Sequence, residues 1–172
     1  KNRLMAVAPH PSPLFPAAAR AGLTFGLVLA LIYTARFLSF SVPLLQVIYF
    51  VGALAVPFLA YRAARTYRDF YYAGGAFRVG QGFGYVVLLH AFGGILAFVP
   101  QYFYFKYAVP STLEAWGEML KASPLVNQAD AERMITDLQL ISTWQWLWTD
   151  YMLTIIMGAV WGLIVGLALR RN

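Results

Sequence analysis

The stretch FLSFSVPLLQVIYFVGALAVPFLAY, residues 37–61, contains no Asp, Glu, Lys or Arg and decides the fold. In a second run, residues 79–105, the only titratable side chain other than tyrosine is that of His90. A helix needs about 20 mainly apolar residues to cross the roughly 30 Å hydrocarbon core of a bilayer, and both runs exceed that length. The chain is therefore predicted to be an integral membrane protein.

The composition of the chain also indicates a membrane protein. Hydrophobic residues make up 60% and charged residues 12%, against about 45–50% and about 25% in soluble domains. The net charge of +6 comes from basic residues at the ends of apolar runs, which indicates membrane orientation and not nucleic-acid binding. The absence of cysteine excludes a thiolate metal site and a cysteine nucleophile.

We predict an all-α fold in which a single domain, residues 17–172, contains four transmembrane helices. The expected spans are about 17–38, 43–61, 80–107 and 144–169. Residues 1–16 are expected to form an irregular leader, because their four prolines remove amide donors and disfavour helix at the preceding residues. Pro57 lies inside the second span and is expected to kink it.

The distribution of Lys and Arg predicts the orientation in the membrane. Lys1, Arg3, Arg20, Arg62, Arg65, Arg68, Arg78, Arg170 and Arg171 fall on one side, and Arg36, Lys106, Lys121 and Arg133 on the other. By the positive-inside rule, both termini and the basic loop before the third span are expected in the cytoplasm. The segment 108–143 is then expected outside, in the periplasm of a bacterial cell.

This outer segment is predicted to be helical. Ser111 and Glu114 have the spacing of a capping box, so we expect a short amphipathic helix on the outer membrane surface that ends before Pro124. Asn127 is expected to cap a further helix. No Pro or Gly interrupts residues 128–157, so that helix is expected to run straight into the fourth span.

Two ridges of small residues are candidate helix-packing surfaces. They comprise Gly158, Gly162 and Gly166 on the fourth span and Ala18, Gly22, Gly26 and Ala30 on the first. Small residues at this spacing let helix backbones approach closely, which matters in lipid because apolar side chains gain little by leaving one hydrocarbon for another. The ridges serve either internal packing or formation of a homodimer.

Four polar side chains form a candidate intramembrane polar site: Arg36, His90, Gln101 and Asp150. The topology places Arg36 and Asp150 on the same side, where they form either a structural ion pair or an outward-facing ion or proton site. His90 is expected to hydrogen-bond a neighbouring helix or to relay protons. A metal site is not predicted, because the only other histidine is His10 in the leader.

Arg62, Arg65 and Arg68 form a basic stripe beside several aromatic residues at the end of the second span. Such a stripe fixes topology and contacts anionic head groups, or it docks a lipid phosphate or an acidic partner. No Ser-His-Asp constellation, carboxylate pair or metal-ligand spacing can be assembled within one half of the membrane. We therefore predict neither enzyme activity nor a cofactor.

The stretch YRDFYYAGGAFRVGQGFGYVVLLHAFGGILAFVPQYFYFKYAVPSTLEAWGEML, residues 67–120, resembles the core of a family of small four-span bacterial inner-membrane proteins of unknown function. The resemblance is carried by Gly74, Gly75, Phe77 and Gly80 in the turn before the third span, and by Phe105, Lys106 and Pro110 after it. It covers residues 17–171. It implies four spans in a bacterial inner membrane and no established activity.

These features favour a non-enzymatic structural or accessory subunit. The expected partners are anionic membrane lipid and either a second copy of the chain or a larger membrane complex, for example an envelope lipid or glycan enzyme. Nucleic acid is not an expected partner. The alternatives are a small oligomeric transporter or channel, with the polar residues lining its path, and a module that binds lipid phosphate.

Overall fold

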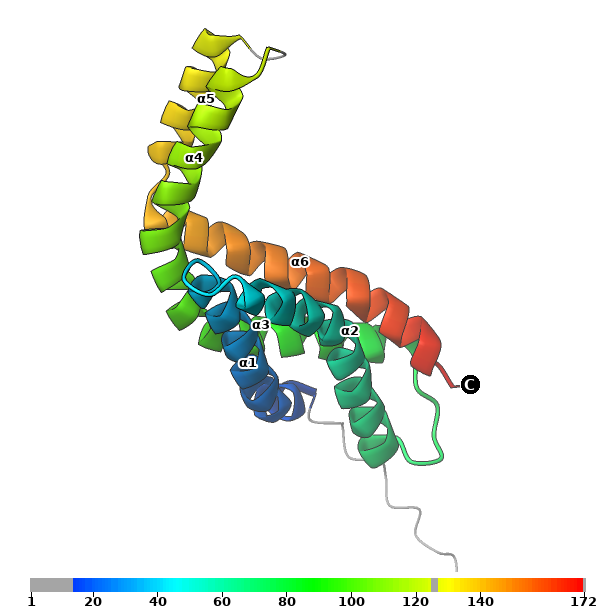
Figure 1. The fold of residues 1–172 in the computed structure, drawn as a ribbon. Helices are drawn as coiled ribbons and strands as arrows, with labels where there is room; N and C mark the ends of the chain where they lie inside the picture. The colour runs from blue at the N-terminus through cyan, green and yellow to red at the C-terminus, as the bar shows by residue number, and fades with distance from the viewer. Residues whose placement is uncertain (1–13, 125–126, 172) are drawn as a thin grey trace, which may run out of the picture.

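The computed structural model describes residues 14–124 and 127–171, and these ranges contain helices and short turns (Figure 1). The helices are α1 (Leu14–Leu38), α2 (Leu44–Tyr71), α3 (Val79–Phe103), α4 (Val109–Ala122), α5 (Gln128–Gln139) and α6 (Thr143–Leu169), with a π-helical turn η1 (Tyr104–Ala108) between α3 and α4. In the described ranges, 4 helices are long and apolar enough to cross a membrane, which confirms the predicted class.

The membrane helices are arranged around α3. Helix α1 packs on one side of α3 and α6 on the other, while α2 leans mainly on α1. We call the end at which α1 begins and α6 ends the basic end, and the opposite end, from which α4 and α5 project, the arm end. The predicted leader falls largely outside the described residues, and α1 begins at Leu14.

Glycines hold the three-helix bundle of α1, α3 and α6 together. The glycines that face α3 are Gly22 and Gly26 on α1 and Gly158, Gly162 and Gly166 on α6. A Cβ atom added to Gly166 would lie 2.5 Å from the carbonyl oxygen of Val79. The glycines of both ridges therefore make packing contacts within the chain.

Helix α2 continues through Pro57 and extends well beyond the predicted end of the second span at residue 61. Arg65 and Asp69 are four residues apart on this extension and form an ion pair, a spacing that supports helix outside the membrane. The turn that follows contains Gly74 with φ 73°, a left-handed conformation that glycine adopts without strain.

A short backbone bridge ties the turn between α2 and α3 to the end of the chain. Phe77 and Arg171 exchange two backbone hydrogen bonds of 2.9 and 3.0 Å. The Phe77 side chain is fully buried and packs edge-on against Tyr67 and Tyr72. The basic end of the bundle is thus closed by an aromatic cluster.

The predicted helix start at Ser111 is wrong. The helix runs without a break from Val79 to Ala122, 44 residues through η1, and the Ser111 hydroxyl donates to the carbonyl of Ala108. Pro110 lacks an amide donor, but it lies two residues after the π-helical turn, where the hydrogen-bond pattern differs from that of an α-helix. The turn therefore accommodates the proline without ending the helix.

The predicted continuous helix from α5 into the fourth span is also wrong. Helix α5 ends at Gln139, and α6 starts afresh with a capping box in which Ser142 and Gln145 bond each other's backbone amides. This box satisfies the first amides of α6, so the chain can turn there. The predicted cap of α5 is confirmed, because the Asn127 side chain accepts a hydrogen bond of 2.9 Å from the amide of Ala129.

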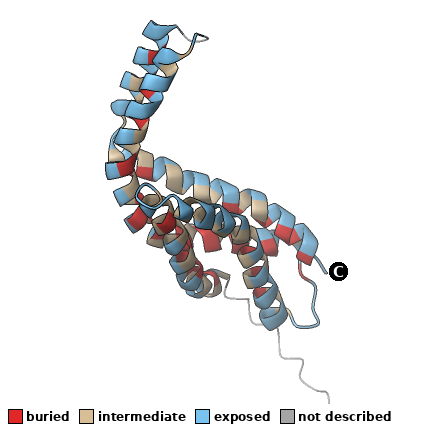
Figure 2. Cartoon of the chain, viewed as in Figure 1, coloured by how far each residue is buried: buried red, intermediate tan, exposed pale blue. Residues whose placement is uncertain are grey.

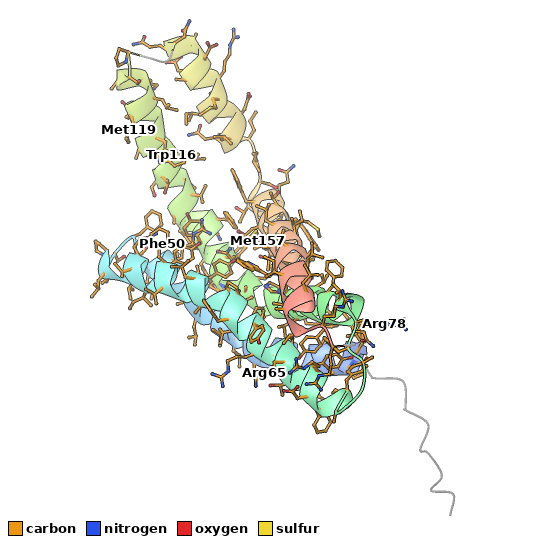
Figure 3. All side chains as sticks on the ribbon, turned by 90° about the vertical axis from the view of Figure 1, so that its right-hand side faces the viewer. Phe50, Arg65, Arg78, Trp116, Met119 and Met157 are labelled. Carbon is orange, nitrogen blue, oxygen red and sulfur yellow. The ribbon has the colours of Figure 1, made fainter. Side chains whose placement is uncertain are left out.

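Helices α4 and α5 form a hairpin, which we call the arm. Figures 1 and 3 both show the arm leaving the bundle at a large angle near η1 and extending sideways beyond it. Pro100 and Pro110 flank this change of direction, and prolines and π-helical turns are common causes of helix bends. Among the described elements α5 contacts only α4, and Figure 2 shows that most of the arm is exposed.

Candidate functional site

Three of the predicted polar residues, Arg36, Gln101 and Asp150, lie near the arm end. Gln101 pairs with Asp150, whereas Arg36 pairs with Tyr104. The Gln101 side-chain amide, 1% exposed, donates to a carboxylate oxygen of Asp150 at 2.5 Å. Nη2 of Arg36 donates to the Tyr104 hydroxyl at 3.1 Å. The ion pairs of the described residues do not join Arg36 to Asp150, so the pair considered from the sequence is not formed.

Aromatic rings from two other helical segments surround Arg36. Its guanidinium carbon lies 4.0 Å from the ring centroid of Tyr104 in η1 and 5.6 Å from that of Tyr49 in α2. Such cation–π contacts stabilise a cation that is partly removed from water. The arrangement explains how Arg36 is accommodated at the end of an apolar helix without a direct ion pair to a described residue.

The Gln101–Asp150 pair joins α3 to α6 inside the bundle. Hydrogen bonding to the carboxylate offsets part of the cost of placing Asp150 among apolar helices. Tyr33 of α1 lies beside Asp150 and Thr154. The other side-chain atom of the amide, Oε1 of Gln101, is buried and finds no partner among the described residues.

His90 occupies a different place, at the crossing of α1, α3 and α6. Its ring packs edge-on against Phe25 and lies against Gly158. The Nδ1 atom is 2.9 Å from the carbonyl of Val86 in its own helix. A carbonyl only accepts, so Nδ1 carries the proton, and the buried Nε2 has no partner in the described part of the chain. The expected bond to a neighbouring helix is thus replaced by a bond within α3.

The polar residues do not form one continuous site. His90 and Gln101 are eleven residues apart on α3, which corresponds to about 16 Å along the helix. Of the described residues, no group of three or more His, Asp or Glu side chains is placed to hold a metal ion. The geometry therefore consists of a buried histidine and a separate amide–carboxylate pair nearer the arm end.

The basic stripe lies on the last turns of α2, and part of its charge is neutralised. Arg65 and Arg68 contact the carboxylate of Asp69 at 3.6 and 2.7 Å. Arg68 also donates to the carbonyl of Leu169 at 3.4 Å, which ties α2 to the end of α6. Arg62 is exposed and has no ion pair among the described residues. The sequence reasoning gave no role to Asp69, although its i, i+4 spacing from Arg65 indicates the pair.

Residues 20–171 match the model of a family described as "Protein of unknown function (DUF4199)". The match covers most of the chain, and the four membrane helices agree with the small four-span protein that the glycine and aromatic patterns predicted. A search of curated proteins gave no match. A search of solved structures also gave no match.

Proposed function

The chain belongs to the DUF4199 family, whose function is unknown, and we propose that it is a non-enzymatic structural or accessory subunit of a membrane complex. The observation that carries this proposal is the arm. Among the described elements helix α5 contacts only α4, and the buried residues of the two arm helices are Leu113, Gly117 and Ala131. So small a core gives little independent stability, which favours an arm that is completed by contact with a neighbour.

The surface of the arm supports this interpretation. Trp116 is 55% exposed and Met119 is 72% exposed, and Figure 3 shows both on the arm, away from the bundle. Trp and Met are enriched in the cores of protein interfaces. In the proposed orientation, the sideways direction of the arm would bring these side chains above a protein that lies beside the bundle in the membrane. A neighbouring membrane protein with an outer domain fits that position.

The orientation belongs to the same proposal. The positive-inside rule puts the basic end in the cytoplasm and the arm on the outer face, which in a bacterial inner membrane is the periplasm. Seven charged residues support an aqueous location for the arm: Glu114, Glu118, Lys121, Asp130, Glu132, Arg133 and Asp137. An envelope lipid or glycan enzyme is one example of a partner that presents a domain on that face.

A transport path has weaker support. His90 is enclosed by Phe25 and Gly158, and it lies about 16 Å along α3 from the Gln101–Asp150 pair. The accessory role predicts that Asp150→Asn and His90→Ala leave function intact. Loss of function from these substitutions in a stably folded protein would favour transport instead.

The test is site-specific photocrosslinking in the native membrane. A photoreactive amino acid replaces Met119 or Trp116, and in the control it replaces Glu118, which lies about 200° around α4 from Trp116. We expect Met119 and Trp116 to crosslink to one protein of defined mass and Glu118 to give little product. A product with a second copy would restrict the role to self-assembly, and products with lipid alone would overturn the proposal.

A further inference from the structure

We propose that a cleft between α1 and α2 at the basic end binds one anionic glycerophospholipid, with an acyl chain in the cleft and the phosphate at Arg20. This site is independent of the arm and of the accessory role. It also differs from the basic stripe, because Arg62, Arg65 and Arg68 do not line the cleft.

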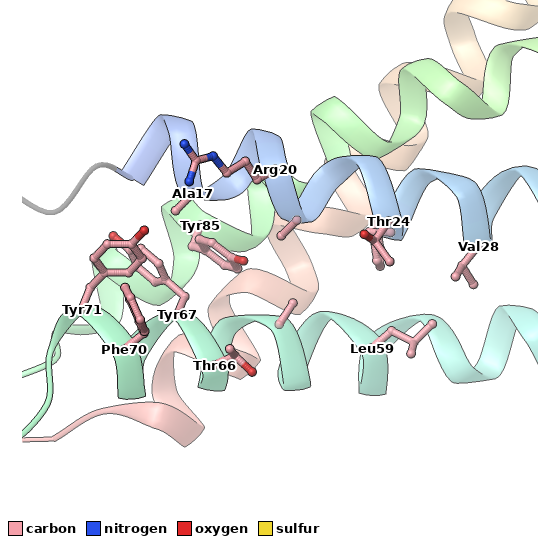
Figure 4. Close-up of a pocket in the computed structure, with 13 residues that line it drawn as sticks. Ala17, Arg20, Thr24, Val28, Leu59, Thr66, Tyr67, Phe70, Tyr71 and Tyr85 are labelled. Carbon is pink, nitrogen blue, oxygen red and sulfur yellow. The ribbon is translucent and has the colours of Figure 1, made fainter.

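The cleft is formed by the way α1 and α2 separate toward the basic end. Nearer the arm end the helices touch, and a Cβ on Gly52 would lie 2.7 Å from Ile32. Toward the basic end, Tyr67 of α2 stacks on Tyr85 of α3 with ring centroids 4.4 Å apart. Helix α2 is thus held against α3 there, and Figure 4 shows an opening between α1 and α2 with Tyr85 at its base.

The size and depth of the cleft fit one acyl chain. Its volume is about 470 Å³, within the range of small-molecule sites, which are mostly apolar with a few polar groups. The α1 wall extends from Ala17 to Val28, which is about 16 Å at 1.5 Å per residue. Half of the hydrocarbon core is about 15 Å. The cleft therefore reaches from the membrane surface to the bilayer centre, the length of a lipid chain in one leaflet.

Two hydroxyl groups in the cleft lack partners. Tyr85 is only 3% exposed, yet its hydroxyl has no hydrogen bond to any described residue, and the residue lines the cleft. The Thr24 hydroxyl is also unbonded there, whereas that of Thr66 on the opposite wall bonds the carbonyl of Arg62 at 3.0 Å. Each of these two hydroxyl groups is a donor that an acceptor in the cleft could use. The ester carbonyls of a glycerolipid are acceptors at a suitable depth just below the phosphate.

The charge at the mouth of the cleft favours an anionic head group. Arg20 lines the cleft, is exposed, and has no ion pair or hydrogen bond among the described residues. Asp69 is the acidic residue at this end, and Arg65 and Arg68 already contact it. A guanidinium without a carboxylate partner at this depth is suited to bind a lipid phosphate.

The test is native mass spectrometry of the full chain after exchange into mixed micelles with dioleoylphosphatidylglycerol or dioleoylphosphatidylcholine. We expect one phosphatidylglycerol to be retained in preference to phosphatidylcholine. Arg20→Gln is expected to lower that preference about five-fold, the effect of one surface charge. Arg62→Gln removes a charge at the same end outside the cleft and is expected to leave the preference largely unchanged.

Further variants test the cleft itself. Ala63→Leu fills the cleft and is expected to lower retention of both lipids, while Tyr85→Phe removes only the unbonded hydroxyl and is expected to weaken retention without adding volume. Wild-type retention in Arg20→Gln and Tyr85→Phe would overturn the proposal. An equal loss of preference in Arg20→Gln and Arg62→Gln would also overturn it, because it would show binding to the basic surface in general. Neither outcome bears on crosslinking through the arm.

Discussion

Helices α2 and α3 are both apolar enough to span a membrane, but the chain places them very differently. In the most apolar window of each helix, 44% of the residues of the α3 segment are buried within the protein, compared with 6% for α2. Because both helices would be surrounded by hydrocarbon, hydropathy does not distinguish an inner helix from an outer one. The difference in burial matches the difference in glycine content. Helix α3 has glycines that face both α1 and α6, whereas α2 contains a single glycine, Gly52.

The comparison separates two uses of an apolar surface. Around α3, glycines permit close backbone contact, and this contact holds α1 and α6 in place. On α2, large side chains such as Leu54 and Phe58, each 72% exposed, face outward. That outward face, the cleft beside it and the arm are among the surfaces available to lipid or protein neighbours.

The largest expected effect comes from adding volume between α3 and α6. Gly166→Val would place a Cβ 2.5 Å from the carbonyl oxygen of Val79 and 3.2 Å from the amide nitrogen of Phe83. Backbone atoms cannot move aside as side chains do, so we expect a loss of about 3 kcal/mol in the free energy of unfolding, the upper end of the usual cost of overpacking. The measurement is an SDS unfolding titration in micelles followed by circular dichroism.

Gly80→Ala is the matched control, because a Cβ there would meet nothing within 4 Å. We expect its unfolding curve to overlap that of the wild type. If Gly166→Val were as stable as Gly80→Ala, close contact between α3 and α6 would not be what places α3 inside the bundle.

A smaller effect is expected from paired truncations on the two helices. Leu89 of α3 is fully buried, whereas Leu54 of α2 is 72% exposed. Leu89→Ala leaves a cavity and should reduce the free energy of unfolding by about 2 kcal/mol. Leu54→Ala exchanges one lipid contact for another and should change it by less than about 0.5 kcal/mol. Equal losses in the same titration would contradict the placement of α2 at the periphery.

The membrane helices were predictable because their signal is local. A run without charges such as residues 37–61 determines a span by itself. The ends of the helices were harder to predict, because the same capping pattern occurs both where a helix starts and where it does not. Ser111 and Ser142 both precede a Glu or Gln three residues later, but only Ser142 starts a helix, because the π-helical turn carries α3 past Ser111. The spacing of the capping pattern is the same at Ser111 and Ser142, so it does not show which serine starts a helix.

The candidate site was less predictable because its contacts join distant segments. The four polar residues were identified from their position in apolar helices, but Arg36 bonds Tyr104, which is 68 residues away in the π-helical turn. The cleft beside Arg20 arises from the separation of two helices. Neither feature has a spacing motif, so both required the arrangement of helices in space.

The smallest loss of stability is expected at Gly52, the glycine of α2 that contacts α1. This substitution tests most directly whether α2 is attached less firmly than α3. A Cβ on Gly52 would meet only the side chain of Ile32, at 2.7 Å, whereas a Cβ on Gly26 would meet the backbone of Gly93 at 2.7 and 2.9 Å. Because few contacts hold α2, it can shift outward into lipid, and Gly52→Ala should cost less than about 1 kcal/mol. Gly26→Ala should cost more, because α1 and α3 have no such freedom. The SDS titration decides between them: an equal or greater loss for Gly52→Ala would mean that α2 is held as firmly as α3, and that exposure on α2 does not indicate a weakly attached helix.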